Sequence, residues 1–300
     1  MAFLHAATSS HGDSKSALRS RGFTPYLLLA PGMLWLITFF IIPIFSLAST
    51  STMVRPEGAP LGQYVQKFRF QNYLDAFQAN QAQYLRSFLY AGIATLLALA
   101  IAYPLAYMIA FRAGRFRNVL LVMVVAPFFT SFLLRTIAWT QILGDDGPVV
   151  SFLKSLPFVT DSLRLTATPF AVVSGLTYNF LPFMTLPLYA SLERIDPRTL
   201  EAAGDLYSNA FTTFRKVTVP LSMPGVVAGT LLTFIPAAGD YVNASILGNP
   251  NTKMIGNVIE SRFFAVVDYP TAAALSFTLM ATILILVTLY IRRSGTDELV

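Results

Sequence analysis

The chain has 300 residues, of which 55% are hydrophobic and only 12% are charged, and its mean hydropathy is +0.60. A soluble domain has about twice that share of charged residues, so the composition excludes an ordinary soluble protein and indicates a membrane protein. The sequence has no cysteine, and its two histidines, His5 and His11, lie near the N-terminus. Disulfides, thiolate metal sites and a histidine-based catalytic or zinc centre are therefore not expected.

In chain order, six stretches are long and apolar enough to cross a bilayer, whose core of about 30 Å requires about 20 mostly uncharged residues. The first is much longer than the apolar region of a secretory signal, so we expect a retained anchor. The third contains one charge, Arg135, and is interpreted as a single span. Prolines inside these stretches predict bent or interrupted helices. We expect an N-terminal tail at 1–21, a transmembrane domain at 22–293 and a C-terminal tail at 294–300, with spans at about 25–50, 87–111, 118–143, 168–191, 219–239 and 270–291.

The charges predict how these spans are oriented. An even number of spans places both termini on one side, and positively charged loops stay in the cytoplasm. With the termini inside, the cytoplasmic segments have five more bases than acids, whereas the outer segments have equal numbers of each. Topology thus explains most of the net charge of +6, and nucleic acid is not an expected partner. The expected location is the bacterial inner membrane, with cytoplasmic termini.

The segment at 193–220, between the fourth and fifth spans, is the most informative cytoplasmic loop. Asp196 followed by Pro197 is typical of a helix start, because the carboxylate accepts from free N–H groups and proline suits the first turn. Apolar residues then recur at helical spacing, and Ser208-Asn209 offers a break into two short helices. Such an amphipathic element either lies on the bilayer surface or fits a groove on a soluble partner.

This loop resembles the EAA loop of permease subunits of ATP-binding-cassette importers. Glu201-Ala202-Ala203 is intact, and the spacing to Val217-Thr218-Val219-Pro220 matches the family pattern. Tyr207 stands where the family has glycine, so Ser208-Asn209 is expected to shape the turn instead. The resemblance implies an all-α membrane protein with six transmembrane helices, a type I importer permease fold, and a coupling loop between spans four and five.

The resemblance also implies how the loop works: a short coupling helix docks into a soluble ATPase and transmits its closure to the membrane helices. Glu201 would contact or orient the partner, although an acid is also favourable in the first turn of any solvated helix. The sequence has no Gly-x-x-x-x-Gly-Lys-Ser/Thr segment, so ATP and magnesium are expected on the partner and no cofactor is expected in this chain. The implied coupling residues are Glu201, Ala202, Ala203, Tyr207, Ser208, Phe211 and Pro220.

Polar residues at membrane depth suggest a translocation path, because charge in lipid is costly and usually functional. Arg135 is the deepest, and it either pairs with a carboxylate on a neighbouring span or contacts the substrate. Asp240 either lines the outer mouth of a pore or caps a helix at the interface. The candidate path residues are Arg135, Trp139, Asp240, Tyr241 and Asn243.

Two segments are similar to spermidine/putrescine permeases: 135–139 running into 143–147, and 239–243 with 247–248 and 254–257. Relatives that carry ferric iron or phosphonates share much of this pattern and remain alternatives. Outer acids could attract a polyamine, although outer bases balance them, and these acids are Asp145, Asp146, Asp240, Glu260 and Asp268. The implied partners are two ATPase subunits, a second and different permease subunit, and an extracytoplasmic solute-binding protein.

Two other function classes fit the sequence less well. A stand-alone ion-coupled carrier usually has conspicuous acids within its spans, and here the spans are almost free of acids. A membrane enzyme requires clustered catalytic residues, and the sequence offers neither a histidine cluster nor a Ser/His/Asp set. The sequence therefore predicts a transporter subunit rather than an enzyme.

Overall fold

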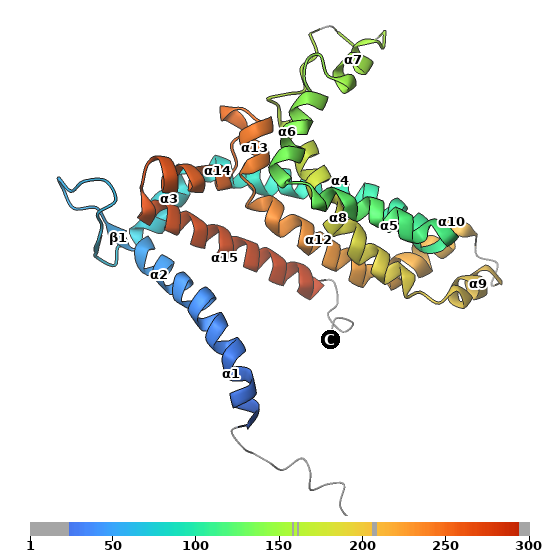
Figure 1. The fold of residues 1–300 in the computed structure, drawn as a ribbon, viewed down its shortest axis with the longest axis horizontal. Helices are drawn as coiled ribbons and strands as arrows, with labels where there is room; N and C mark the ends of the chain where they lie inside the picture. Colours follow the sequence, from blue (N-terminus) through green and yellow to red (C-terminus); the bar gives the residue numbers. More distant parts are fainter. Residues whose placement is uncertain (1–23, 158, 161, 206–208, 294–300) are drawn as a thin grey trace, which may run out of the picture. The chain divides into compact units, whose positions relative to one another are not determined.

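The structure is a computed structural model that describes residues 24–157, 159–160, 162–205 and 209–293, so both expected tails lie outside the described residues (Figure 1). The chain divides into two compact units, residues 1–47 and 48–300. The first contains α1 (Thr24–Leu36), η1 (Ile37–Ile41) and the beginning of α2 (Ile42–Ser51). The side chains described in this unit are mostly exposed and apolar, as expected of a helix that faces lipid.

The second unit is built around long apolar helices. They are α4 (Gln81–Phe111), α5 (Arg117–Val125), α6 (Phe132–Ile142), α8 (Pro169–Glu193), α12 (Met223–Ala238) and α15 (Tyr269–Arg293). Short elements connect them: β1 (Met53–Val54), β2 (Val65–Gln66), α3 (Gln71–Ala79), η2 (Gly114–Phe116), η3 (Ala126–Phe129), α7 (Pro148–Lys154), α9 (Pro197–Asp205), α10 (Ala210–Thr213), η4 (Phe214–Thr218), α11 (Val219–Leu221), α13 (Val242–Leu247), η5 (Pro250–Thr252), α14 (Ile255–Glu260) and η6 (Ser261–Ala265). The two strands form a small antiparallel pair.

By length and composition, four of the described helices can cross a membrane, and the number rises to six if two bent helix pairs each form one span. The four are Tyr26–Ser51, Gln81–Phe111, Pro169–Glu193 and Tyr269–Arg293. The bent pairs are Gly114–Phe129 with Phe132–Ile142, at 97°, and Ala210–Leu221 with Met223–Ala238, at 64°. The expected third and fifth spans fall on these two pairs.

The third expected span is therefore bent sharply rather than one continuous helix. Pro127 cannot donate a backbone hydrogen bond, and the chain tightens into the 3-10 turn η3 at this point. Thr130 and Ser131 then adopt extended backbone angles, which ends the first helix and redirects the second. The sequence predicted an interruption near this proline, but the direction of α6 depends on these two extended residues.

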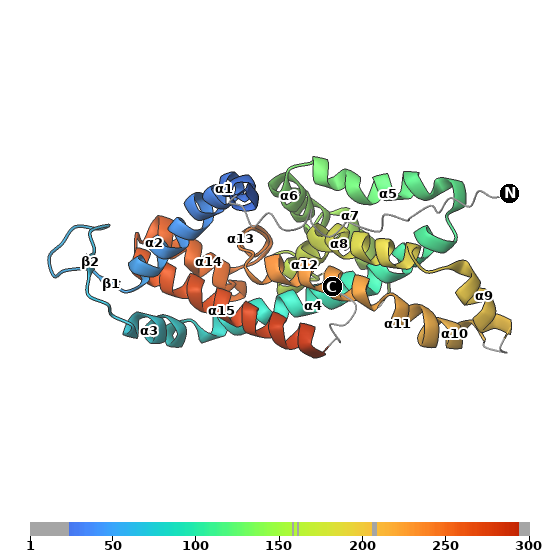
Figure 2. The ribbon, with the colours of Figure 1, turned by 90° about the horizontal axis from the view of Figure 1, so that it is seen from below.

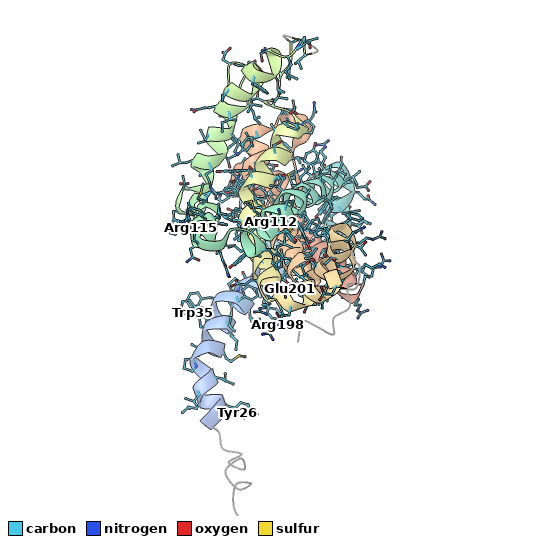
Figure 3. The ribbon with its side chains drawn as sticks, turned by 90° about the vertical axis from the view of Figure 1, so that its right-hand side faces the viewer. Tyr26, Trp35, Arg112, Arg115, Arg198 and Glu201 are labelled. Carbon is cyan, nitrogen blue, oxygen red and sulfur yellow. The ribbon has the colours of Figure 1, made fainter. Side chains whose placement is uncertain are left out.

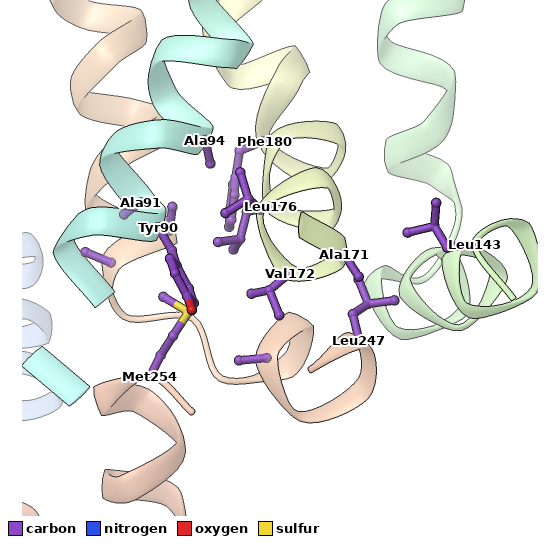
Figure 4. Packing of buried hydrophobic residues seen from close by; sticks show 14 residues of the cluster. Tyr90, Ala91, Ala94, Leu143, Ala171, Val172, Leu176, Phe180, Leu247 and Met254 are labelled. Carbon is purple, nitrogen blue, oxygen red and sulfur yellow. The ribbon is translucent and has the colours of Figure 1, made fainter. Parts of the chain in front are cut away.

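The core of the second unit lies where α4, α8 and α12 pack together. Small residues make this close packing possible, because they let helix backbones approach one another. An added Cβ at Gly225 of α12 would lie 2.7 Å from the carbonyl oxygen of Pro187 on α8. Larger side chains pack together in part of this core, among them Tyr90, Leu176 and Phe180 (Figure 4). On α4 the contact is a stripe of fully buried alanines, Ala91, Ala94, Ala98, Ala102 and Ala106.

Within the second unit, the elements of the candidate coupling loop lie at one end of the long helices (Figure 2). The loop elements α9 to α11 lie at the same end as the turn from α4 to α5, and α3 and α14 lie at the other end (Figure 2). Figure 3 looks onto the first of these ends, where Arg112 and Arg115 lie with Arg198 and Glu201. Three of the bases that predict cytoplasmic loops, Arg112, Arg115 and Arg198, therefore lie at the end that holds the candidate coupling loop (Figure 3).

Candidate functional site

The candidate coupling loop forms two short helices, as its sequence predicted. The carboxylate of Asp196 accepts a hydrogen bond from the backbone N–H of Arg198 at 2.9 Å, and α9 begins at Pro197. The side chain of Asn209 accepts from the N–H of Thr212 at 2.7 Å and starts α10. Both helix starts follow from local capping, which a sequence reveals directly.

The loop presents several of its predicted coupling residues to solvent. Glu201, Ala202 and Pro220 are exposed, Ala203 is half-buried, and Phe211 is 71% exposed. Tyr207 and Ser208 lie outside the described residues. An exposed phenylalanine and an exposed acid on the same loop offer both apolar area and charge to a partner.

Where the loop begins, an ion pair ties it to the start of α5. Arg117 forms this pair with Glu193, the last residue of α8, and also donates a hydrogen bond to the hydroxyl of Tyr189. The guanidinium carbon of Arg117 lies 5.1 Å from the centre of the Tyr189 ring, close enough for a cation–π contact. The beginning of the loop is thus joined to the third expected span as well as the fourth.

Where the loop ends, it is joined to α4. The Phe214 ring lies 5.5 Å from the Tyr103 ring and 6.0 Å from the Tyr107 ring, edge to face in both cases. The hydroxyls of Tyr103 and Ser222 are 2.7 Å apart and hydrogen-bonded, and Ser222 lies at the 64° bend between α11 and α12. A displacement of the loop would therefore reach α4 and α12 through the contacts that Tyr103 makes with Phe214 and Ser222.

A cavity of about 520 Å³ lies between the end of α8 and the beginning of α12, next to the start of α9. Arg194, Asp196 and Thr199 provide its polar wall. Gly225 and Ala228 on α12 and Ala190 on α8 form part of its apolar wall. The first turn of the coupling loop thus forms one wall of a cavity between two of the membrane helices.

At the other candidate site, a buried hydrogen-bond network links α6, α8 and α13. The side-chain nitrogen of Asn179 on α8 lies 3.1 Å from the hydroxyl of Thr136 and 3.0 Å from Oδ1 of Asn243. The backbone and side-chain nitrogens of Asn243 in turn donate to Oδ2 of Asp240, at 2.8 and 3.2 Å. The network therefore brings together two of the predicted path residues, Asp240 and Asn243, and adds Asn179 and Thr136.

Arg135 adjoins this network without taking part in its hydrogen bonds. It is 8% exposed, and its Nε and Nη1 have no hydrogen-bond partner among the described residues. It lines a cavity of about 550 Å³ together with Asn179, whose Oδ1 also lacks a partner among those residues. Buried polar groups are usually hydrogen-bonded, so this buried guanidinium stands out among the described residues.

The two aromatic candidates lie differently. Trp139 packs against Tyr178 of α8, with ring centres 5.5 Å apart, and is half-buried. Tyr241 is 47% exposed, and its backbone carbonyl accepts from Asn257 at 2.8 Å. The Tyr241 side chain thus stands apart from the buried network, while Trp139 lies against the helix that supplies Asn179.

The outer acids are only partly available to a cation. Asp145 pairs with Arg164 at 3.3 Å, and Asp268 pairs with Arg262 at 3.5 Å. Asp240 has no ion-pair partner among the described residues, and these residues contain no group of three or more His, Cys, Asp or Glu side chains suited to a metal. Asp240 is therefore the buried carboxylate best placed to meet a cationic group.

Sequence reasoning missed Asn179, Thr136, Tyr103 and Ser222. An asparagine in the middle of an apolar span is a recognisable signal, because an amide in lipid must find a partner. Tyr103 and Ser222 gave no such signal, since hydroxyls in membrane helices often bond to their own backbone. Only the crossing of α4 over the 64° bend joins these two.

Residues 98–294 match the family model of the binding-protein-dependent transport system inner membrane component. The chain belongs to this family. It is accordingly a multi-pass inner-membrane component of a binding-protein-dependent transport system rather than an enzyme.

Curated relatives agree with the family. The chain is 37% identical over 259 residues to the spermidine/putrescine transport system permease protein PotB of Haemophilus influenzae, covering 86% of this chain and 90% of the relative. It is 34% identical over 260 residues to PotB of Escherichia coli, covering 87% and 94%. It is also 36% identical over 233 residues to the inner membrane ABC transporter permease protein YdcU of Escherichia coli, covering 73% and 74%.

Solved structures confirm the expected all-α permease fold. The chain is similar to a chain in the crystal structure of a bacterial alginate ABC transporter in complex with a periplasmic protein bound to alginate pentasaccharide, with a TM-score of 0.73 and 17% identity over 91% of this chain and 94% of that one. A second alginate importer structure gives a TM-score of 0.65 and 16% identity over 92% and 96%. At such low identity the likeness shows the fold alone.

Proposed function

We propose that this chain, with a second and different permease subunit, forms the translocation path of an importer for polyamines such as spermidine or putrescine. The observation that supports it most is the 34–37% identity, over 86–87% of the chain, to permeases that are named for spermidine/putrescine transport. The likeness extends through the candidate path and the coupling loop, so it covers the parts of the chain that would set both substrate and coupling.

The buried network offers chemistry suited to an ammonium group. Asp240 is 8% exposed, and no basic side chain of the described residues pairs with it, so its charge is not neutralised by an ion pair although Asn243 donates to its Oδ2. Trp139 and Tyr178 add aromatic faces nearby on α6 and α8, and such faces attract cations. In this proposal Asp240 and Asn243 receive one end of the polyamine, while Trp139 and Tyr241 line its route.

The proposed coupling runs through the loop at 193–220. Glu201 and Phe211, both exposed, dock into one subunit of an ATPase dimer on the cytoplasmic side, and ATP with magnesium binds there. Closure of the ATPase moves the loop, and the contacts of Phe214 and Ser222 with Tyr103 pass that movement to α4 and α12. A solute-binding protein delivers the substrate from the outer side, and both termini lie in the cytoplasm.

The substrate is tested by uptake of labelled spermidine and putrescine into cells that lack the chromosomal gene and express this chain from a plasmid. We expect saturable uptake that unlabelled polyamines inhibit and that ferric iron and a phosphonate do not. Asp240→Asn should raise the half-saturating concentration, whereas Asp146→Asn, an exposed outer acid, should not. Inhibition by iron or phosphonate alone would assign the importer to another solute.

Coupling and assembly are tested by native mass spectrometry of the tagged chain extracted in mild detergent. We expect two different permease subunits with two ATPase subunits. Glu201→Ala should reduce uptake and ATPase recovery while the permease pair persists. Recovery of the chain alone, with uptake unaffected by Glu201→Ala, would favour an ion-coupled carrier.

Orientation is tested with single cysteines, which are unique because the chain has none of its own. An impermeant maleimide should label Glu57→Cys in intact spheroplasts and should label Arg198→Cys only after permeabilisation, since both positions are exposed. The reverse pattern would overturn the proposed topology.

A further inference from the structure

The cavity around Arg135 holds a charge that the described residues do not neutralise. The side chain is buried in a cavity of about 550 Å³, and two of its nitrogens, Nε and Nη1, have no hydrogen-bond partner there. Its guanidinium carbon lies 5.6 Å from the Phe128 ring centre and 5.7 Å from that of Phe132. Phe180 and Phe183 complete the aromatic part of the wall.

A guanidinium cannot escape this situation by losing its proton, because arginine stays charged in proteins. The two phenylalanine rings offset part of the cost of burial through cation–π contacts. They leave Nε and Nη1 without a hydrogen-bond partner among the described residues. Carboxylate oxygens make the strongest hydrogen bonds with such guanidinium N–H groups, because the charges are opposite. The cavity therefore calls for an anionic oxygen group.

Among the residues that the structure describes, no carboxylate meets this need. The ion pairs of the described residues do not include Arg135. The expected spans contain no Asp or Glu. The nearest acid is Asp240, just beyond the fifth span, and its Oδ2 already accepts two hydrogen bonds from Asn243. The missing anion must come from another molecule.

We propose that this cavity receives an Asp or Glu side chain of the second permease subunit, which forms an ion pair with Arg135. The inference rests on the proposed function, because it requires two different permease subunits. A second copy of this chain is a poorer match, since the acid that it offers near membrane depth is already bonded to Asn243. Pairing with Arg135 would thus favour a different chain that carries an intramembrane acid.

The rim of the cavity favours a packed protein segment over a lipid headgroup. Phe129, on the cavity wall, is 89% exposed, and four of the other lining residues are also phenylalanines, with Thr130 and Ser131 as polar exceptions beside it. Leu133 and Leu134, which follow this stretch in sequence, are 52% and 60% exposed. An apolar rim around a buried charge is complementary to a helix that presents one acid among apolar residues. A phosphate would instead remain at headgroup level, in contact with water and polar groups.

The first test places the photo-crosslinking residue benzoylphenylalanine at position 129 in the assembled complex. We expect an adduct with a peptide of the second permease subunit that contains an acid. The same residue at Phe264, which is 73% exposed and lies outside this cavity, serves as the control and should not give that adduct. Adducts only with lipid, or only with a second copy of this chain, would overturn the proposal.

The second test changes the charge. Arg135→Gln should lower recovery of the second permease with the tagged chain by about tenfold or more, because the partner's acid would be left buried and unpaired. Arg164→Gln, with a side chain that is 78% exposed, should leave recovery unchanged. A charge swap separates a lost ion pair from misfolding of Arg135→Gln. In the swap, Arg135→Asp in this chain is combined with an arginine that replaces the crosslinked acid of the second permease subunit.

Restored recovery in this charge swap would establish the pair, and failure of the swap together with normal recovery of Arg135→Gln would refute it. Polyamine uptake by the unchanged complex is measured in the same cells. If the complex imports polyamines normally but gives no crosslink, the Arg135 ion pair is refuted and the proposed function stands. If the crosslink forms but the complex imports another solute, only the proposed substrate is refuted.

Discussion

Asn179, in the middle of α8, donates a hydrogen bond from its side-chain nitrogen to Oδ1 of Asn243 on α13, over 3.0 Å. The approach depends on Gly175, one turn earlier on α8, where an added Cβ would lie 2.7 Å from that same oxygen. Asn179 lies within the fourth expected span and Asn243 just beyond the fifth, and the two meet inside the protein, where neither amide can bond to bulk water. This contact makes α8 part of the candidate path.

Replacing Asn179 should weaken both the structure and the path. Asn179→Leu keeps the volume similar but leaves Oδ1 of Asn243 and the hydroxyl of Thr136 without their shared donor. We expect a loss of about 0.6–2 kcal/mol in stability, the range for such bonds between membrane helices, and reduced uptake. Thermal unfolding in detergent and uptake assays measure the two effects. Asn118→Leu, at an exposed position, is the control; equal effects of both variants would contradict the assignment.

Glycines on α12 and α4 should respond oppositely to the same substitution. Gly225→Ala places a Cβ 2.7 Å from the Pro187 carbonyl oxygen, so α8 and α12 must separate, and less folded protein should be recovered. Gly92→Ala meets nothing within 4 Å and should be neutral or stabilising by up to about 1 kcal/mol, since alanine favours helix. Fluorescence-detected size exclusion after a heating series compares them. A stable Gly225→Ala variant would mean that the helices pack less closely.

The ion pair between Arg117 and Glu193 should contribute little to stability. Its side chains are 34% and 42% exposed, so water and salt screen the attraction. A double-mutant cycle with Arg117→Gln and Glu193→Gln should give a coupling energy of about 0.2–1 kcal/mol that falls at high salt. Thermal melts at two salt concentrations measure it. A larger, salt-independent coupling would show that the pair is shielded from solvent.

The hydroxyl contact at the 64° bend should matter for coupling more than for folding. Tyr103→Phe and Ser222→Ala each remove one of the two hydroxyls that form the 2.7 Å hydrogen bond. Tyr103→Phe also keeps the ring that contacts Phe214. Each should cost about 1 kcal/mol, and the double variant should cost hardly more than either single one. Substrate imported per ATP hydrolysed, measured in proteoliposomes, should decrease. Strictly additive losses would show that the two hydroxyls act independently.

The amino-acid sequence alone determined where the long apolar helices lie, because the bilayer forces backbone groups to bond within each segment and leaves long apolar runs in the sequence. It also determined the start of the coupling helix, since Asp196 caps a neighbouring N–H and needs no distant partner. The family resemblance followed from such short segments, at 201–203 and 217–220.

The tertiary structure decided how these segments meet. The 97° bend depends on extended angles at Thr130 and Ser131, which no apolar pattern specifies. Asn179 finds its partners on α6 and α13, at 43 and 64 residues' separation, and Tyr103 finds Ser222 at 119. The sequence shows Arg135 as a charge within a span. Only the packed helices show that its Nε and Nη1 have no hydrogen-bond partner among the described residues. Helices form from neighbours in sequence, whereas a path through the membrane forms from residues that only packing brings together.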